Sequence, residues 1–131
     1  MANALYPKAK EQFLQGGINM SSGTIKATLV DTGTYTYSSA HQWLSDLSGI
    51  VGTPQTIGSK TFTNGTFDGS DVSFPLVAGS SAEAIVIYLD TGVAGTSPLL
   101  SYQDSGVTGL PVTPSGGNIN IVWDAAGIWT I

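Results

Sequence analysis

The sequence predicts a mainly β, single-domain protein, a β-sandwich or small barrel of about seven strands with two short helices near the N-terminus. Three observations favour this fold class. The chain has 131 residues, which fits one domain of ordinary size. A hydrophobic content of 41% is enough for a core, and 17 glycines, 15 serines and 15 threonines with only 10% charged residues predict a mostly neutral surface around it. Helical periodicity ends near Gly52, after which turn signals separate short apolar runs.

Two short helices are expected. The first covers Tyr6–Gln15, because Pro7 suits a first helical turn, Gly16 can end it, and one face is apolar: Leu5, Ala9, Phe13 and Leu14. The second is predicted at about residues 40–48. Ser39 and Gln42 form an S-x-x-Q capping box there, and apolar residues follow at helical spacing: Ala40, Trp43, Leu44 and Leu47. We therefore divide the single domain, residues 1–131, into an N-terminal arm, residues 1–22, and a β core, residues 23–131.

Alternating and continuous apolar runs predict the strands. Thr24–Val30 alternates polar and apolar residues, as a half-buried strand does. Ala84–Leu89 is apolar on both alternating sets, which predicts a central strand covered on both faces. Further strands are expected at Val72–Leu76, where Pro75 favours a sheet edge, and at two later segments: Pro98–Gln103 and Asn118–Trp123.

Two hairpins are predicted from turn chemistry. Asn64-Gly65 favours a type I′ turn, which would pair Thr63 with Thr66 and bring together the flanking aromatic residues, Phe62 and Phe67. Near the C-terminus, a loop at Ala125-Ala126 would pair Trp123 with Ile128.

The C-terminal hairpin is expected to have two unlike faces. One is a core face: Ile119, Ile121, Trp123 and Ile128. The other begins polar and ends apolar: Asn118, Asn120, Val122, Trp129 and Ile131. A charge-free apolar tail is seldom left in water, so either the helices of the same subunit or a neighbouring subunit should cover it. The same choice applies to the first helix, and the candidate interface residues are Phe13, Leu14, Val122, Trp129 and Ile131.

The charge balance excludes several classes of partner. Four lysines, no arginine and nine acidic residues give a net charge of -5, and no basic residue follows Lys60. Nucleic-acid and anionic-membrane partners are therefore not expected, because both need clustered cations. The longest apolar run, Ala84–Leu89, is far shorter than the ~20 residues of a membrane helix, and the first residues lack the apolar segment of a signal peptide. Without cysteine, the chain is compatible with a reducing cytoplasm.

Catalytic chemistry is scarce, and we expect no enzyme activity and no cofactor. His41 is the sole histidine, and it is predicted on the outer face of the second helix with no acid at i+3 or i+4 to orient it. Glu83 and Asp90 are seven residues apart and so lie on opposite faces of a strand, which excludes a catalytic carboxylate pair.

The sequence offers two alternatives for a ligand site. Three oxygen-bearing residues around one turn could share a calcium ion, but Asx-Gly turns explain them without a metal, and we expect none: Asn64, Asp68 and Asp71. Three aromatic residues without a predicted core place could form a sugar-stacking platform: Tyr35, Tyr37 and Trp129.

A resemblance extends over nearly the whole chain. Four pieces occur in order: L-Y-x-K-x-x-x-x-F-L from Leu5, I-K-A-x-L-V-D-T from Ile25, G-L-P-V-T-P-x-G-G from Gly109, and the final W-D at Trp123. With these pieces the chain resembles a family of short virion structural proteins of tailed bacteriophages. The resemblance implies a location on the virion and transfers no catalytic residue.

Two functions are therefore weighed. The first, which the resemblance favours, is a capsid decoration (cement) protein that binds the assembled head and stabilises it. Its partners would be the major capsid protein and other copies of itself, with a trimer favoured. It would be made in the host cytoplasm and carried on the capsid surface. The alternative is a tail- or fibre-associated structural module, with a possible host-surface glycan as ligand.

Overall fold

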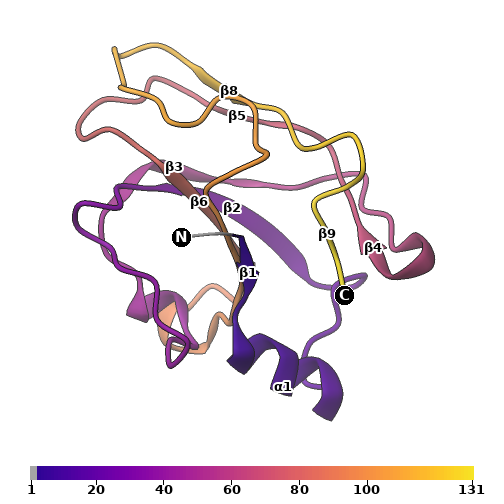
Figure 1. Ribbon diagram of the computed structural model, residues 1–131. Coiled ribbons are helices and arrows are strands. Elements are labelled where there is room, and N and C mark those ends of the chain that lie inside the picture. The colour runs from indigo at the N-terminus through magenta and orange to yellow at the C-terminus, as the bar shows by residue number, and fades with distance from the viewer. Residues whose placement is uncertain (1–2) are drawn as a thin grey trace.

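The computed structural model describes residues 3–131, and strands dominate it (Figure 1). Its one α-helix, α1, spans Pro7–Gln15. Three 3₁₀ turns follow along the chain: η1 (Leu44–Asp46), η2 (Thr63–Gly65) and η3 (Ala94–Thr96). The strands within these residues are β1 (Ala4–Leu5), β2 (Thr24–Val30), β3 (Ile50–Thr56), β4 (Thr66–Phe67), β5 (Val72–Phe74), β6 (Ala84–Asp90), β7 (Leu99–Gln103), β8 (Ile119–Ile121) and β9 (Trp129–Thr130). The prediction of a mainly β protein is confirmed.

Five strands form one antiparallel sheet in the order β1-β7-β6-β2-β3. β6 lies at its centre, and the segment Ala84–Tyr88 is buried along its whole length, as the continuous apolar run predicts. The sheet has two free edges, β1 and β3, so it is not closed into a barrel and that alternative was wrong. Neither edge strand was predicted, because β1 is only two residues long and β3 contains Gly52 and Pro54, which interrupt an alternating pattern.

Both faces of this sheet are covered. On one side, the short pairs β5–β8 and β4–β9 form a second layer, visible above and to the right of the main sheet in Figure 1. The Gln103 side chain of β7 reaches this layer and donates to the Ile128 carbonyl oxygen at 2.9 Å. On the other side, Tyr102 contacts the rings of Tyr35 and Tyr37 from the loop that follows β2. The core therefore continues through both faces of the sheet.

The N-terminal helix forms nearly where the sequence places it. Pro7 occupies the first turn, and Gly16 ends the helix in the left-handed conformation at φ 74°. Tyr6 and Ala9 are fully buried, so the N-terminal arm packs as part of the core. Within residues 3–131, no helix is long and apolar enough to cross a membrane.

The second predicted helix is wrong. Residues 40–48 contain only the 3₁₀ turn η1, and the expected Ser39 cap is replaced by Asp46, whose carboxylate accepts the amides of Gln42 and Trp43. The competing interaction is tertiary. The Gln42 carbonyl accepts from the Leu99 amide at 2.8 Å, and the segment bridges to the residues before β7. A helix this short is marginal by itself, so pairing with the sheet prevails.

The Asn64-Gly65 turn is confirmed, with both residues at positive φ. Its predicted register continues to Thr61 and Asp68, which exchange backbone hydrogen bonds of 2.9 and 3.1 Å. The C-terminal hairpin is wrong, because β9 pairs with β4 instead of returning along β8. The predicted core face nevertheless holds, since its four residues are all buried: Ile119, Ile121, Trp123 and Ile128.

Candidate interaction groove

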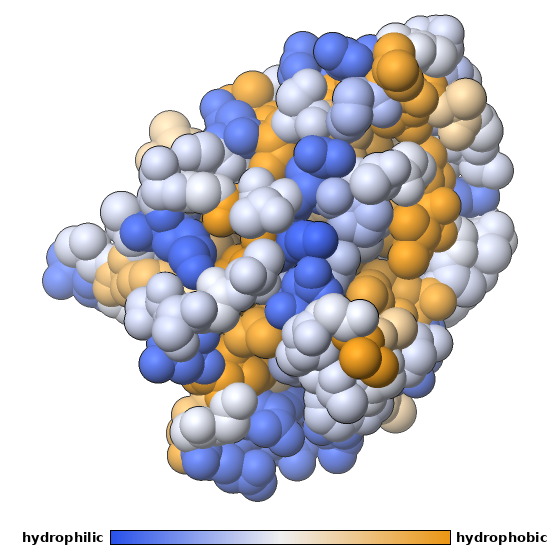
Figure 2. Space-filling view, turned by 180° about the vertical axis from the view of Figure 1, so that it is seen from behind, coloured by the Kyte–Doolittle hydropathy of each residue, from blue (hydrophilic) through white to orange (hydrophobic). Residues whose placement is uncertain are grey.

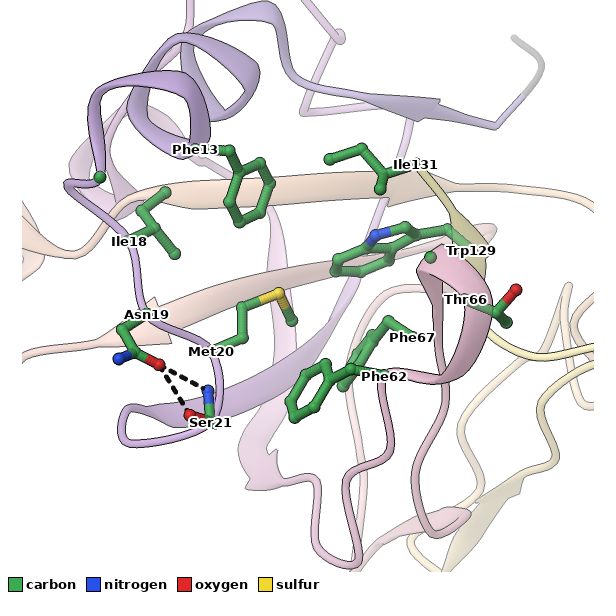
Figure 3. A pocket seen from close by; sticks show the side chains of 12 residues that line it. Phe13, Ile18, Asn19, Met20, Ser21, Phe62, Thr66, Phe67, Trp129 and Ile131 are labelled. Atoms are coloured by element: carbon green, nitrogen blue, oxygen red, sulfur yellow. Dashed lines mark hydrogen bonds between the residues drawn. The ribbon is translucent and has the colours of Figure 1, made fainter.

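An apolar groove opens where the N-terminal and C-terminal segments meet the Asn64 hairpin (Figure 3). Its volume is about 570 Å³. In Figure 3 the Trp129 indole lies in its middle, with Phe13 and Ile131 on one side. On the other side lie Met20 and the two hairpin phenylalanines. The complete lining is Phe13, Gly16, Ile18, Asn19, Met20, Ser21, Phe62, Gly65, Thr66, Phe67, Trp129 and Ile131.

Strand pairing positions the aromatic side chains of the groove. Because β9 pairs with β4, Phe67 stands opposite Trp129, and their ring centroids are 4.7 Å apart. The tight hairpin turn then places Phe62 on Phe67, with centroids at 5.8 Å. The Ile131 amide donates to the Gly65 carbonyl at 2.9 Å, which fixes the chain end beside the turn. The aromatic floor is thus held by backbone hydrogen bonds rather than by a flexible loop.

Polar contacts hold the segment of residues 18–21, which forms another side of the groove. The Lys60 ammonium donates to the carbonyl oxygens of Met20 and Gly23, both at 2.6 Å. The Asn19 carboxamide oxygen accepts from the Ser21 amide at 3.0 Å. No side chain that lines the groove carries a charge. An apolar, uncharged surface of a partner would therefore fit it without desolvating an ion.

Three of the five candidate interface residues meet in this groove: Phe13, Trp129 and Ile131. Trp129 is half-buried against its own subunit, whereas Ile131 is 67% exposed. The other two candidates lie outside the groove: Leu14 is 89% exposed on α1, and Val122 is 44% exposed beside its bridge to Thr108. The subunit itself therefore covers the C-terminal tail only in part.

Sequence reasoning missed part of the groove. Phe62 and Phe67 were assigned only to their hairpin, and Met20 was not assigned. The hairpin register supplied a signal that the two phenylalanines share a face. Nothing in the sequence placed that face beside Trp129, since the pairing of β4 with β9 joins segments more than 60 residues apart.

His41 is part-buried and ends a chain of hydrogen bonds from the core, instead of lying on an exposed helix face. Its Nδ1 lies 2.7 Å from the Tyr35 hydroxyl, which lies 2.8 Å from the Tyr6 hydroxyl. With Nδ1 as acceptor, Tyr35 donates to His41 and Tyr6 donates to Tyr35. Burial raises the pKa of both tyrosines. The chain joins Tyr6 to the loop that follows β2, and the part-buried His41 forms its outer end.

The carboxylates considered for catalysis make structural contacts. Glu83 accepts from the Ser81 hydroxyl at 2.6 Å and from the Thr32 amide at 3.0 Å, and these bonds lower its pKa. Asp90 accepts from the Gly92 amide and pairs with Lys26 at 3.0 Å, which likewise lowers its pKa. Each therefore secures a connection at one end of β6.

The two weighed ligand sites are occupied by internal contacts. Asp71 accepts the Trp123 amide at 3.0 Å, and Asp68 accepts the Gly69 amide at 2.8 Å. Within residues 3–131, no three His, Cys, Asp or Glu side chains gather as metal ligands would. Tyr35 is 2% exposed and packs with Tyr37 around Tyr102, so the alternative of a sugar platform with Trp129 does not form.

The rear surface is a mosaic of apolar and weakly polar residues with hydrophilic ones scattered between them (Figure 2). This agrees with the charged content of only 10%. No protein-family model matches the chain, and a search of curated proteins finds no relative. The resemblance to phage virion proteins therefore stays a prediction.

Proposed function

We propose that this protein is a non-enzymatic virion structural protein, most specifically a capsid decoration protein that binds the assembled head and stabilises it. The observation that carries the proposal is the uncharged groove, in which Phe13, Trp129 and Ile131 are only partly covered. Such a surface gains free energy when a partner removes it from water. The sequence resemblance supplies the setting, and the partners proposed are the major capsid protein and further copies of this chain.

The fold suits a cementing role for a physical reason. Its ionic groups are few, and Lys26, Asp90 and Glu83 are engaged within the subunit. Docking can therefore bury neutral hydroxyl and apolar surface with little cost of stripping water from charges. A trimer remains the favoured oligomer of the proposal, located on the capsid surface.

The test is co-sedimentation of the purified protein with undecorated heads. We expect stoichiometric pelleting and a higher temperature of head disruption. Trp129→Ala should weaken head binding about tenfold or more, because truncating a central aromatic anchor commonly costs over 1.4 kcal/mol. Val93→Ala is the matched control, since Val93 is 60% exposed and does not line the groove.

Two results would contradict the proposal. Wild-type protein left in the supernatant would exclude head decoration. Equal binding by the Trp129 and Val93 variants would exclude the groove as the contact surface.

The alternative is a tail- or fibre-associated module. Densitometry of purified virions distinguishes the two, because a head shell carries far more copies than a tail. The glycan version of this alternative is weakened by the burial of Tyr35, which takes that ring away from a stacking platform with Trp129.

A further inference from the structure

A second opening, which we call the slot, lies between β1 and β9 and has a volume of about 520 Å³. It differs from the groove because most of its exposed lining is polar. The lining residues are Asn3, Ala4, Leu5, Lys10, Ser101, Gln103, Ile128, Trp129 and Thr130. Three independent features of the slot point to the same kind of ligand.

The first feature is a pair of strand edges with which no other strand of residues 3–131 pairs. The backbone amide of Tyr6 donates to the Leu100 carbonyl at 3.0 Å. In an antiparallel ladder, hydrogen-bonded residues alternate with residues whose N–H and C=O face outward, so those of Leu5 point away from β7. Ile131 donates to the Gly65 carbonyl in the same way, so the N–H and C=O of Thr130 point away from β4. Leu5 and Thr130 both line the slot, which therefore offers backbone donors and acceptors from two sides.

The second feature is the hydroxyl of Ser101. This side chain is 1% exposed, and its Oγ is the only buried side-chain polar atom in residues 3–131 without a hydrogen-bond partner. Ser101 lies two residues before Gln103 on β7, so both side chains leave the same face of the sheet, toward Ile128. Gln103 finds its acceptor in the Ile128 carbonyl, whereas the Ser101 hydroxyl lies at the slot without one. An acceptor supplied from outside would satisfy it.

The third feature is the charge of Lys10, the only charged side chain among the described residues that line the slot. The other lysines have partners at home. Lys8 pairs with Glu11, Lys26 pairs with Asp90, and Lys60 donates to two carbonyl oxygens. In residues 3–131, Lys10 alone among the lysines has no such partner. The slot thus presents one unpaired cation and no carboxylate, which favours a ligand that carries negative charge.

We propose that the slot receives one extended, acidic polypeptide segment of a partner protein. The segment adds a strand along the free edge of β9, with its backbone bonded to Thr130 on one side and facing Leu5 on the other. One of its carbonyl oxygens accepts from the Ser101 hydroxyl, and a carboxylate lies against Lys10. A strand is the ligand whose repeating N–H and C=O groups match two strand edges at once. The slot adjoins the groove, since Trp129 lines both, but this inference uses the contacts of Leu5, Ser101, Lys10 and Thr130 and does not rest on the proposed virion role.

The experiment is a titration of the full ¹⁵N-labelled chain with a capped peptide, acetyl-Thr-Val-Glu-Val-Glu-Val-Thr-amide, followed by amide chemical shifts and hydrogen exchange. We expect the Leu5 and Thr130 amides to shift and the Thr130 amide to exchange more slowly when the peptide binds. The same peptide with lysine in place of glutamate, and an N-methylated acidic peptide, should bind at least about tenfold more weakly.

Two variants test the contacts. Lys10→Gln should weaken binding of the acidic peptide about fivefold, while Lys8→Gln on the same helix should leave it unchanged. Ser101→Ala should weaken binding by about threefold to tenfold without lowering the melting temperature, because the hydroxyl has no partner in the free protein. A purely structural serine would show the opposite pattern.

Three outcomes would overturn the inference. The first is an absence of shifts at Leu5 and Thr130 with millimolar acidic peptide. The second is binding of a control peptide as tight as that of the acidic peptide. Equal binding of the lysine peptide would exclude recognition of negative charge, and equal binding of the N-methylated peptide would exclude backbone pairing. The third is an equal response to free glutamate, which would indicate a simple carboxylate site in place of a strand acceptor. None of these outcomes bears on head binding through the groove.

Discussion

The two sides of the main sheet differ in how completely the subunit buries and hydrogen-bonds their side chains. On the side of the loop after β2, Tyr6, Tyr35 and Tyr102 are buried, and the Tyr35 hydroxyl bonds both the Tyr6 hydroxyl and His41. On the side of β9, Trp129 stays half-buried, and the Ser101 hydroxyl has no partner. The first side satisfies itself within the subunit. The second keeps apolar area, strand edges and a donor available, which is what an interaction surface requires.

This difference indicates which side of the sheet contributes more to the free energy of unfolding of the isolated subunit. On the tyrosine side the Tyr6 and Tyr35 hydroxyls are bonded within the subunit, so changes to them should be measured as loss of folding. The β9 side should tolerate change in the isolated subunit and lose binding instead. Three predictions test this difference, beginning with the largest effect on the free energy of unfolding.

The largest contrast is expected between two isoleucines. Ile87 in β6 is fully buried, so Ile87→Ala should lower the free energy of unfolding by about 2–5 kcal/mol through lost burial and a cavity. Ile131 is 67% exposed, so Ile131→Ala should change it by less than about 0.5 kcal/mol. Urea denaturation of both variants measures the difference. Similar losses in the two variants would show that the C-terminal tail belongs to the core.

A smaller loss is expected when the buried tyrosine chain is interrupted. Tyr35→Phe leaves the hydroxyl of Tyr6 and Nδ1 of His41 without their partner, which should cost about 1–3 kcal/mol. Tyr37→Phe is the control, because within residues 3–131 the Tyr37 hydroxyl makes no hydrogen bond. Calorimetry should show a lower melting temperature for the first variant only. Unchanged melting of Tyr35→Phe would mean that water replaces the chain without loss.

The smallest effect concerns acid. The pKa of Glu83 is lowered from 4.5 by its bonds to Ser81 and Thr32, so the folded state binds the proton less readily than the unfolded state. The carboxylate therefore contributes stability above about pH 4.5, and this contribution is lost as the pH falls through the folded pKa. Glu83→Gln should flatten the dependence of the melting temperature on pH between about 6 and 3.

Glu11→Gln provides the comparison for that acid titration, since Glu11 is exposed and paired only with Lys8. It should leave the pH dependence close to that of the wild type. If Glu83→Gln left the dependence of the melting temperature on pH unchanged, the Glu83 carboxylate would not be the group that stabilises the contact between β6 and the loop after β2.

Local signals predicted the elements whose residues decide their own conformation. Thr24–Val30 forms β2 with the predicted bounds, α1 begins at Pro7 and ends before Gly16, and the Asn64 turn has the predicted register. The helix predicted around Gln42 is wrong, because the backbone there pairs with the start of β7 instead of forming helical hydrogen bonds. The same kind of long-range pairing took β9 away from β8.

The candidate site divides in the same way. Its apolar side chains could be chosen from the sequence, since uncharged aromatic and aliphatic residues near a chain end are conspicuous, and Phe13, Trp129 and Ile131 do meet. Leu14 and Val122 satisfy the same criterion and lie elsewhere. Composition cannot separate them, because exposure depends on which segment packs over each residue.

By itself, the sequence determined a mainly β chain with a buried central strand, a short N-terminal helix and a neutral, charge-poor surface. Hydrophobic periodicity and turn chemistry depend on residues close together in the sequence, so these features can be predicted from the sequence alone. Only the tertiary structure decided that β9 joins β4, which creates both the groove and the slot. That pairing joins segments far apart in the chain, and its free energy comes from contacts that exist only once the sheet has formed.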